Sequence, residues 1–109
     1  MKRHWFYILL SLAERDRHGS GIARDVLELT DGELHLWPAT LYGSLEELVE
    51  KGWLDALDET GRHPEGESER KRYFRITRAG RRALEAESRR MAELVAVTQR
   101  RLVRSEEAR

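Results

Sequence analysis

The 109-residue sequence contains no cysteine. This absence excludes disulfides, thiolate metal sites and cysteine nucleophiles, and it is compatible with a reducing compartment. Long apolar runs are also missing, since no stretch approaches the roughly 20 consecutive apolar residues that a membrane-spanning helix needs. We therefore expect a soluble, cytoplasmic protein without a membrane partner.

Residue arrangements typical of catalysis are missing as well. The four histidines are scattered, without the spacing of a helical metal pair or of an H-E-x-x-H motif. Gly19 and Gly21 lack the Gly-Lys-Ser/Thr pattern and the preceding strand of a phosphate-binding loop. Paired carboxylates such as Glu46 and Glu47 lie where a solvated helix surface is the ordinary explanation. We expect no enzyme, no metal and no cofactor.

The net charge is zero, but the charges are unevenly distributed along the chain. Residues 31–69 carry eleven acidic side chains and two basic ones, whereas residues 70–82 carry seven basic side chains and no acidic one. A chain of this kind can present a basic surface although its charges cancel in total. Zero net charge therefore does not exclude nucleic acid as a partner.

The spacing of apolar residues predicts four helices. Capping residues, a proline suited to a first helical turn and helix-stopping glycines set their limits. The predicted helices run from about Trp5 to Ala13, from the N-cap Ser20 to a stop at Asp31 and Gly32, from Pro38 to Gly52, and from the N-cap Thr77 to about Arg104.

Three short strands are expected, over residues 33–37, 53–59 and 70–76, the last two joined as a hairpin across a polar loop tip. The order helix, helix, short strand, helix, hairpin, helix is that of a winged helix-turn-helix with an added helix. We expect a mainly α protein with a small β-hairpin wing. Residues 1–76 would form the winged helix-turn-helix domain and residues 77–109 a C-terminal dimerisation helix, together one compact unit.

The last predicted helix carries a heptad-like seam of residues spaced alternately by four and three. The first predicted helix is apolar on more than one side, so a second surface has to cover it. We therefore expect a homodimer with a symmetric interface. The predicted dimerisation residues are Phe6, Tyr7, Leu10, Leu84, Met91, Leu94, Val95 and Leu102.

The third predicted helix separates two kinds of face. Its leucines form one stripe, while Ala39, Tyr42, Gly43 and Glu46 form the opposite stripe, with Thr40 and Ser44 on its flank. Small residues would let this face come close to another surface. Tyr42 would then contact a thymine methyl group or a phosphate, or alternatively pack on the edge of the domain.

The entrance to this helix is also distinctive. Trp37 occupies the expected N-cap position and has no side-chain acceptor, so the first backbone N–H groups lack a local partner. Such a helix end suits an anion, and either a DNA phosphate or water could occupy it.

The predicted hairpin carries basic side chains on both sides of its tip. They could straddle a phosphate backbone or enter a minor groove, although three glutamates in the same tip argue against a uniformly basic wing. The candidate DNA-binding residues of the wing are Arg62, His63, Arg70, Lys71 and Arg72.

Three stretches occur in order along the chain: "HGSGIARDV", "PATLYGSLEELVEKGWL" and "RKRYFRITRAGRRAL". They resemble, respectively, the stretch opening the second helix, the Pro-small-Thr-Leu-Tyr helix, and the wing strand with the entrance to the last helix in PadR-like transcriptional regulators. The single terminal helix is similar to that of the family's short form.

The resemblance implies a sequence-specific DNA-binding regulator, a repressor acting as a homodimer on a double-stranded operator. The operator-reading helix would carry Pro38, Ala39, Thr40, Tyr42 and Gly43, and the hairpin over residues 62–72 would be the wing. Ser20 is a further DNA-contact candidate, although it stands where the family usually has tyrosine. Glu46 and Glu47 also depart from the family, because many relatives carry basic residues there.

Some regulators that resemble this chain sense phenolic or planar aromatic compounds. Because the last helix has no aromatic residue, a small aromatic ligand that releases the protein from DNA would lie near Trp5, Phe6 and Met91. The alternative function is a winged-helix protein-interaction module without specific DNA binding. Zero net charge and the two glutamates of the third helix favour that alternative.

Overall fold

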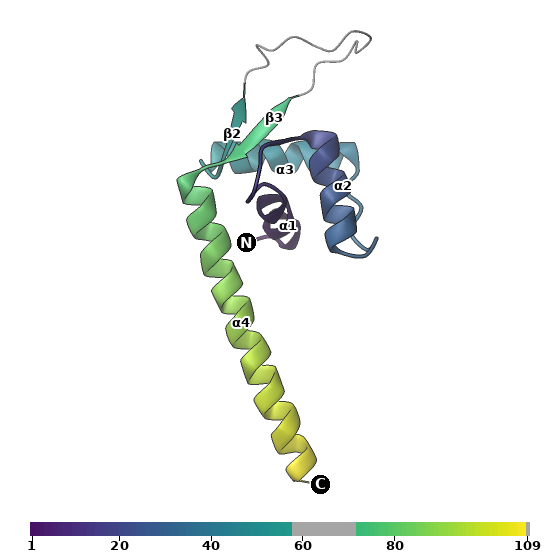
Figure 1. The fold of residues 1–109 in the computed structure, drawn as a ribbon, viewed down its shortest axis with the longest axis vertical. Helices are drawn as coiled ribbons and strands as arrows, with labels where there is room; N and C mark the ends of the chain where they lie inside the picture. The colour runs from purple at the N-terminus through teal and green to yellow at the C-terminus, as the bar shows by residue number, and fades with distance from the viewer. Residues whose placement is uncertain (58–71, 109) are drawn as a thin grey trace.

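The computed structural model describes residues 1–57 and 72–108, which form four helices and three short strands (Figure 1). The predicted mainly α class with a small β-hairpin is confirmed. The elements are α1 (Arg3–Ser11), β1 (Arg17–His18), α2 (Gly19–Leu29), α3 (Pro38–Glu50), β2 (Leu54–Leu57), β3 (Tyr73–Ile76) and α4 (Arg78–Glu107).

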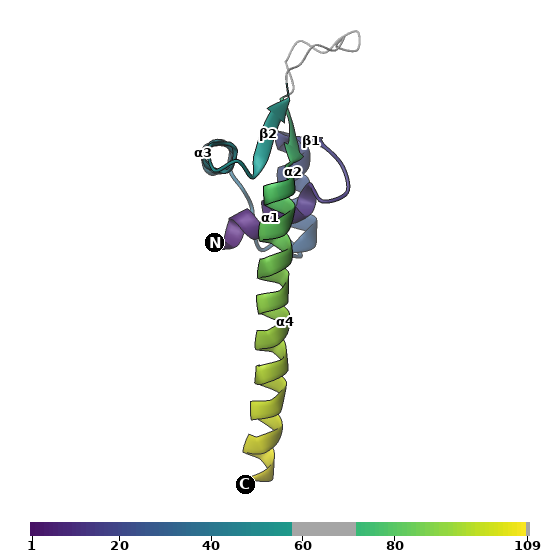
Figure 2. The ribbon, with the colours of Figure 1, turned by 90° about the vertical axis from the view of Figure 1, so that its left-hand side faces the viewer.

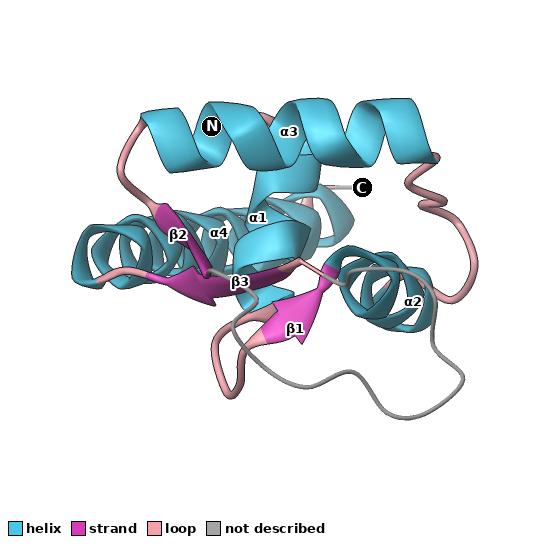
Figure 3. Ribbon diagram, turned by 90° about the horizontal axis from the view of Figure 1, so that it is seen from above, coloured by secondary structure: helices cyan, strands magenta, loops and turns pink. Residues whose placement is uncertain are grey.

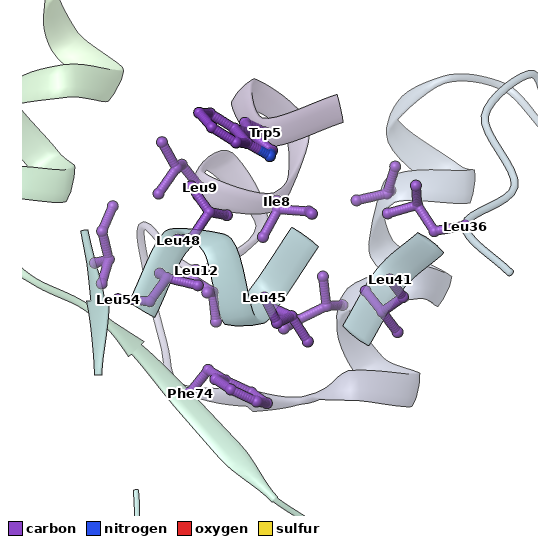
Figure 4. Packing of buried hydrophobic residues seen from close by; sticks show 13 residues of the cluster. Trp5, Ile8, Leu9, Leu12, Leu36, Leu41, Leu45, Leu48, Leu54 and Phe74 are labelled. Carbon is purple, nitrogen blue, oxygen red and sulfur yellow. The ribbon is translucent and has the colours of Figure 1, made fainter. Parts of the chain in front are cut away.

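One hydrophobic core joins α1, α2, α3 and the hairpin strands (Figure 4). Helix α1 contributes Trp5, Ile8 and Leu9 from one face, and α3 contributes three leucines. Burying an aliphatic side chain of this size stabilises the fold by about 1.5–3 kcal/mol. The leucines therefore fix which face of α3 points inward. The core residues are Trp5, Ile8, Leu9, Leu12, Ile22, Val26, Leu36, Leu41, Leu45, Leu48, Leu54, Phe74 and Ile76.

The three strands form an antiparallel sheet in the order β1, β3, β2 (Figure 3). Strands β2 and β3 pair as predicted, with Ala56 opposite Phe74. The prediction of a strand over residues 33–37 is wrong, and β1 pairs with β3 instead. The alternation in residues 33–37 has another cause. Leu34 and Leu36 pack on the core from a loop, and no strand within residues 1–57 and 72–108 pairs with them.

The second helix starts differently from the prediction. Its N-cap is His18, whose Nδ1 accepts a hydrogen bond from the Gly21 N–H at 3.1 Å, so the prediction of Ser20 as N-cap is wrong. A histidine can cap because its unprotonated ring nitrogen is an acceptor. The end of the helix is as predicted, with Asp31 and Gly32 both at positive φ.

The start of α4 is hydrogen-bonded to the segment that connects α3 to β2. The Thr77 N–H donates to the Trp53 carbonyl at 3.0 Å, and the Thr77 hydroxyl donates to the Gly52 carbonyl at 2.6 Å. The same hydroxyl oxygen accepts from the Gly80 N–H and caps α4, as predicted. The helix continues to Glu107, beyond the expected end near Arg104. Its C-terminal half extends away from all other described elements (Figures 1 and 2).

Candidate nucleic-acid interface

Helix α3 begins as its sequence predicts. Pro38 occupies the first helical position, and Trp37 is the N-cap without a side-chain hydrogen bond to the helix. The Trp37 carbonyl accepts from the Leu41 N–H at 2.9 Å, the first bond of the helix. The preceding N–H groups of the first turn have no partner within the helix, so they can receive an oxygen from outside.

The two faces of α3 separate sharply. Leu41, Leu45 and Leu48 are buried, whereas the predicted contact residues Pro38, Ala39, Thr40, Tyr42 and Gly43 are all exposed. Ser44 does not flank this exposed face, because it is only 3% exposed and lies on the leucine side of the helix. The exposed residues of α3 therefore form a shallow surface from which one aromatic ring projects.

Gly43 lies in open space within the protomer. A methyl group at this position would meet no described atom within 4 Å beyond its own helix backbone and chain neighbours. Glycine inside a helix costs about 0.5–1 kcal/mol relative to alanine. Packing within the protomer therefore does not explain this glycine, whereas close approach of another molecule would.

We expect Gly43→Ala to raise the free energy of unfolding by about 0.5–1 kcal/mol, because alanine is the better helix former. If α3 reads an operator, as the sequence predicts, affinity for that operator should fall at the same time, because the added methyl group would hold α3 away from the DNA. Urea denaturation and fluorescence anisotropy on the same preparation measure both effects. A variant that is more stable and binds operator as tightly as the wild type would contradict the assignment of Gly43 to the contact surface.

An aromatic pair precedes α3 and was not among the predicted contact residues. The rings of His35 and Trp37 stack with 3.9 Å between centroids and 8° between planes, and Trp37 is 64% exposed. The pair lies beside the open end of α3. The sequence could have indicated this pair, because His35 and Trp37 are two positions apart and such side chains on extended backbone point to the same side.

A hollow of about 430 Å³ separates α3 from the hairpin. Its floor includes Leu45 and Phe74, and its rim carries Glu46 and Glu50 of α3 together with Arg72 beside β3. Within the described part of the chain, neither glutamate is in an ion pair. Glu47, by contrast, pairs with Lys2 at 2.9 Å. The glutamates that line this hollow are therefore free to repel or attract an incoming group.

The base of the hairpin presents Arg72 as an exposed residue. Nearby, Arg75 of β3 forms an ion pair with Asp16 at 2.8 Å, and hydrogen bonding to this carboxylate raises the pKa of Arg75. This pair ties β3 to the loop before β1. The other predicted wing residues, Arg62, His63, Arg70 and Lys71, lie outside the described residues.

Ser20 is exposed in the first turn of α2. Its hydroxyl is not required as the helix cap, because His18 has that role. Tyr42 of α3 reaches the same turn: a methyl group at Gly19 would lie 2.6 Å from the Tyr42 hydroxyl oxygen. The structure thus brings Ser20 and Tyr42 to one region, where α2 begins.

The residues predicted for dimerisation fall into two groups. Leu84 packs against the core of its own protomer, and Phe6 and Tyr7 are partly buried. The second group is exposed and includes Leu10 of α1 and four apolar residues in the later turns of α4. A partner helix could cover such side chains. This second group consists of Leu10, Met91, Leu94, Val95 and Leu102.

The three residues predicted to hold a ligand lie in different environments. Trp5 is a core residue whose ring packs edge-on against Trp53, at 6.0 Å between centroids. Its Nε1 atom is buried and has no hydrogen-bond partner among the described residues. Phe6 is partly buried and packs edge-on against Tyr7, whereas Met91 is exposed on α4.

Two other kinds of feature bear on function, namely metal sites and membrane-spanning helices. Within residues 1–57 and 72–108, no group of three or more His, Cys, Asp or Glu side chains is placed to hold a metal ion. No helix of the described part combines the length and apolar character needed to cross a membrane. The exposed face of α3, the start of α2 and the hairpin base are thus the candidate site.

An exposed helix held by its leucines, beside a hairpin and following α2, defines a winged helix-turn-helix protein. The sequence profile of the Transcriptional regulator PadR-like family matches residues 8–86. The chain belongs to this family of transcriptional regulators.

Solved structures share the fold at low sequence identity. A PadR family transcription regulator from Clostridium difficile is 24% identical, with 90% of this chain and 96% of that chain covered and a TM-score of 0.72. A transcriptional regulator from Clostridium thermocellum is also 24% identical, with coverages of 88% and 86% and a TM-score of 0.71. Bacillus subtilis PadR, solved in complex with operator DNA, is 18% identical, with coverages of 78% and 46% and a TM-score of 0.64. A search of curated proteins found no match.

Proposed function

We propose that this PadR-family regulator binds double-stranded operator DNA in a sequence-specific manner and reads it with α3. The observation that carries the proposal is the separation of faces on α3: its leucines are buried, and its small residues and Tyr42 are exposed. An α-helix of this kind fits the major groove. The operator complex of the similar Bacillus subtilis PadR supports the same partner.

In this proposal, Ala39, Thr40, Tyr42 and Gly43 face the bases, and the open helix end at Pro38 receives a phosphate. Ser20 and Arg72 contact the backbone on either side. The remaining wing contacts come from Arg62, His63, Arg70 and Lys71. Such backbone contacts position the protein, whereas the contacts of α3 supply the specificity.

The regulator acts as a homodimer joined through α4, with residues 1–76 as the DNA-binding part. Two copies of α3 then enter successive major grooves about one helical turn apart. Binding at a promoter would exclude polymerase, so we propose repression in the cytoplasm. A small aromatic ligand near Phe6 and Met91 would release the protein from DNA.

Fluorescence anisotropy on a duplex from the chain's own promoter, compared with a shuffled duplex over a salt series, tests the proposal. The wild type should prefer the promoter duplex, and its affinity should fall steeply as salt rises, because phosphate contacts release counterions. Arg72→Ala should weaken binding to both duplexes and lower the salt slope by about one.

The matched control is Arg100→Ala, which removes an exposed arginine from α4, distant from α3. It should leave affinity and salt slope close to those of the wild type. No preference for the promoter duplex, or an affinity independent of salt, would refute the proposed function.

A second candidate function is a protein-interaction module, and the hollow beside α3 favours it. Glu46 and Glu50 on its rim would repel DNA phosphates but suit a basic segment of a partner protein. In that case the wild type would show no preference for the promoter duplex, and Glu46→Gln would weaken capture of the basic partner. Pull-down with the wild type and with the Glu46→Gln variant separates the two functions.

A further inference from the structure

Gly19, the first residue of α2, is buried, and its conformation does not explain why it is glycine. The glycines at positive φ among the described residues are Gly32 and Gly52, so Gly19 has a backbone conformation that other residues adopt readily. Gly19 is not needed as the helix cap either, since the His18 side chain has that role. The reason for a glycine therefore has to lie in the space around it.

That space is filled by Tyr42, which is 23 positions further along the chain. A methyl group at Gly19 would lie 2.6 Å from the Tyr42 Oη, 2.9 Å from its Cζ and 3.1 Å from its Cε1. Contacts this short cannot persist, so the phenol end of Tyr42 lies where a side chain at position 19 would be. Because Gly19 has no side chain, it leaves a space that the end of the Tyr42 ring occupies, and we call this space the Tyr42 seat.

Tyr42 is only partly held by this seat. The residue is 45% exposed, and its other surroundings include the open hollow between α3 and the hairpin. An added methyl group would therefore displace the free end of a flexible side chain rather than backbone. The ring would move to another position while α2 and α3 stay in place.

From this geometry we propose that Gly19 is a positioning residue for DNA reading: it sets the orientation in which Tyr42 meets the operator. The inference rests on the proposed function, in which Tyr42 contacts DNA. In this proposal Gly19 affects specificity through Tyr42, without contacting a base itself. Prepositioning has a physical benefit, because a side chain already held in its bound orientation loses less conformational freedom on binding.

A double-mutant cycle tests this coupling. We expect Gly19→Ala to weaken promoter binding about tenfold, as for loss of one well-formed base contact, while the urea midpoint changes little. In a Tyr42→Ala background, the same Gly19→Ala substitution should cause almost no further loss. A direct clash of the new methyl group with DNA would instead weaken binding in both backgrounds.

Gly21→Ala is the matched control, because it adds a methyl group in the same turn of α2. Its nearest contact would be an ordinary 3.6 Å from the His18 ring. Promoter affinity should stay within error of the wild type. Equal losses for Gly19→Ala in the two backgrounds, or no loss at all, would overturn the inference while leaving the proposed function intact.

Fluorine NMR on protein labelled with 3-fluorotyrosine reads the ring position without DNA. The chain has three tyrosines, and Tyr42→Phe assigns the resonance of Tyr42. Gly19→Ala should shift this resonance, whereas Gly21→Ala should not.

An unshifted resonance would overturn the inference whatever the binding data show. A wild type without promoter preference would overturn the proposed function, and the inference with it.

Discussion

Replacing Val95 and Leu102 together by aspartate should convert the proposed dimer to monomers and weaken promoter binding by about 100-fold or more, because the two half-site contacts are then no longer linked. These residues are seven positions apart on one face of α4 and are 56% and 62% exposed in the protomer. An isolated stretch of helix is marginally stable in water. Covering this face with a second α4 removes apolar side chains from solvent, and burying two carboxylates from each helix would prevent it.

Analytical ultracentrifugation gives the oligomeric state, and anisotropy gives the affinity. Arg100→Asp is the control, because it places aspartate on the opposite face of α4, which should remain outside the interface. It should stay dimeric and bind the promoter duplex. A double variant that remains dimeric, or a wild type that sediments as a monomer, would contradict the proposed interface.

Gly80→Ala should lower the free energy of unfolding by about 3 kcal/mol or more, the upper part of the range for overpacking a core. A methyl group at Gly80 would lie 2.2 Å from the carbonyl oxygen of Trp53 and 2.9 Å from the Ile76 side chain. This carbonyl accepts the Thr77 N–H. Backbone has to move to relieve the clash, so the junction of α3, β2 and α4 would open.

Urea denaturation followed by tryptophan emission measures the loss, and Gly21→Ala again serves as the control, with an expected change below about 1 kcal/mol. The comparison separates the steric effect at Gly80 from the general effect of adding a methyl group to a helix. Equal stability of the two variants would show that the α4 junction tolerates a side chain.

The faces of α3 could be predicted from the sequence because they follow from local geometry. Side chains three and four positions apart lie on the same side of a helix, so the spacing of Leu41, Leu45 and Leu48 predicts the buried stripe and, by exclusion, the exposed one. The Thr77 cap and the stop at Gly52 depend equally on neighbouring residues. The confirmed family membership follows from motifs of the same local kind.

Strand β1 could not be predicted in this way. Arg17 and His18 carry no apolar alternation, and they form a strand because β3 offers a free edge beside them. Residues 33–37 do alternate, yet none of the described strands pairs with them, and their leucines pack on the core instead. Strand pairing depends on contacts between distant segments, which a local pattern does not contain.

By itself, the sequence determined the mainly α class, the leucine stripe that α3 buries and the motifs of a PadR-like regulator, because each depends on residues within a few positions of one another. Only the tertiary structure decided that Tyr42 lies against Gly19, that His18 of β1 pairs with Tyr73 of β3, and that Trp5 belongs to the core. These features arise where separate segments meet, and the space available between them is set by the packing of the whole chain.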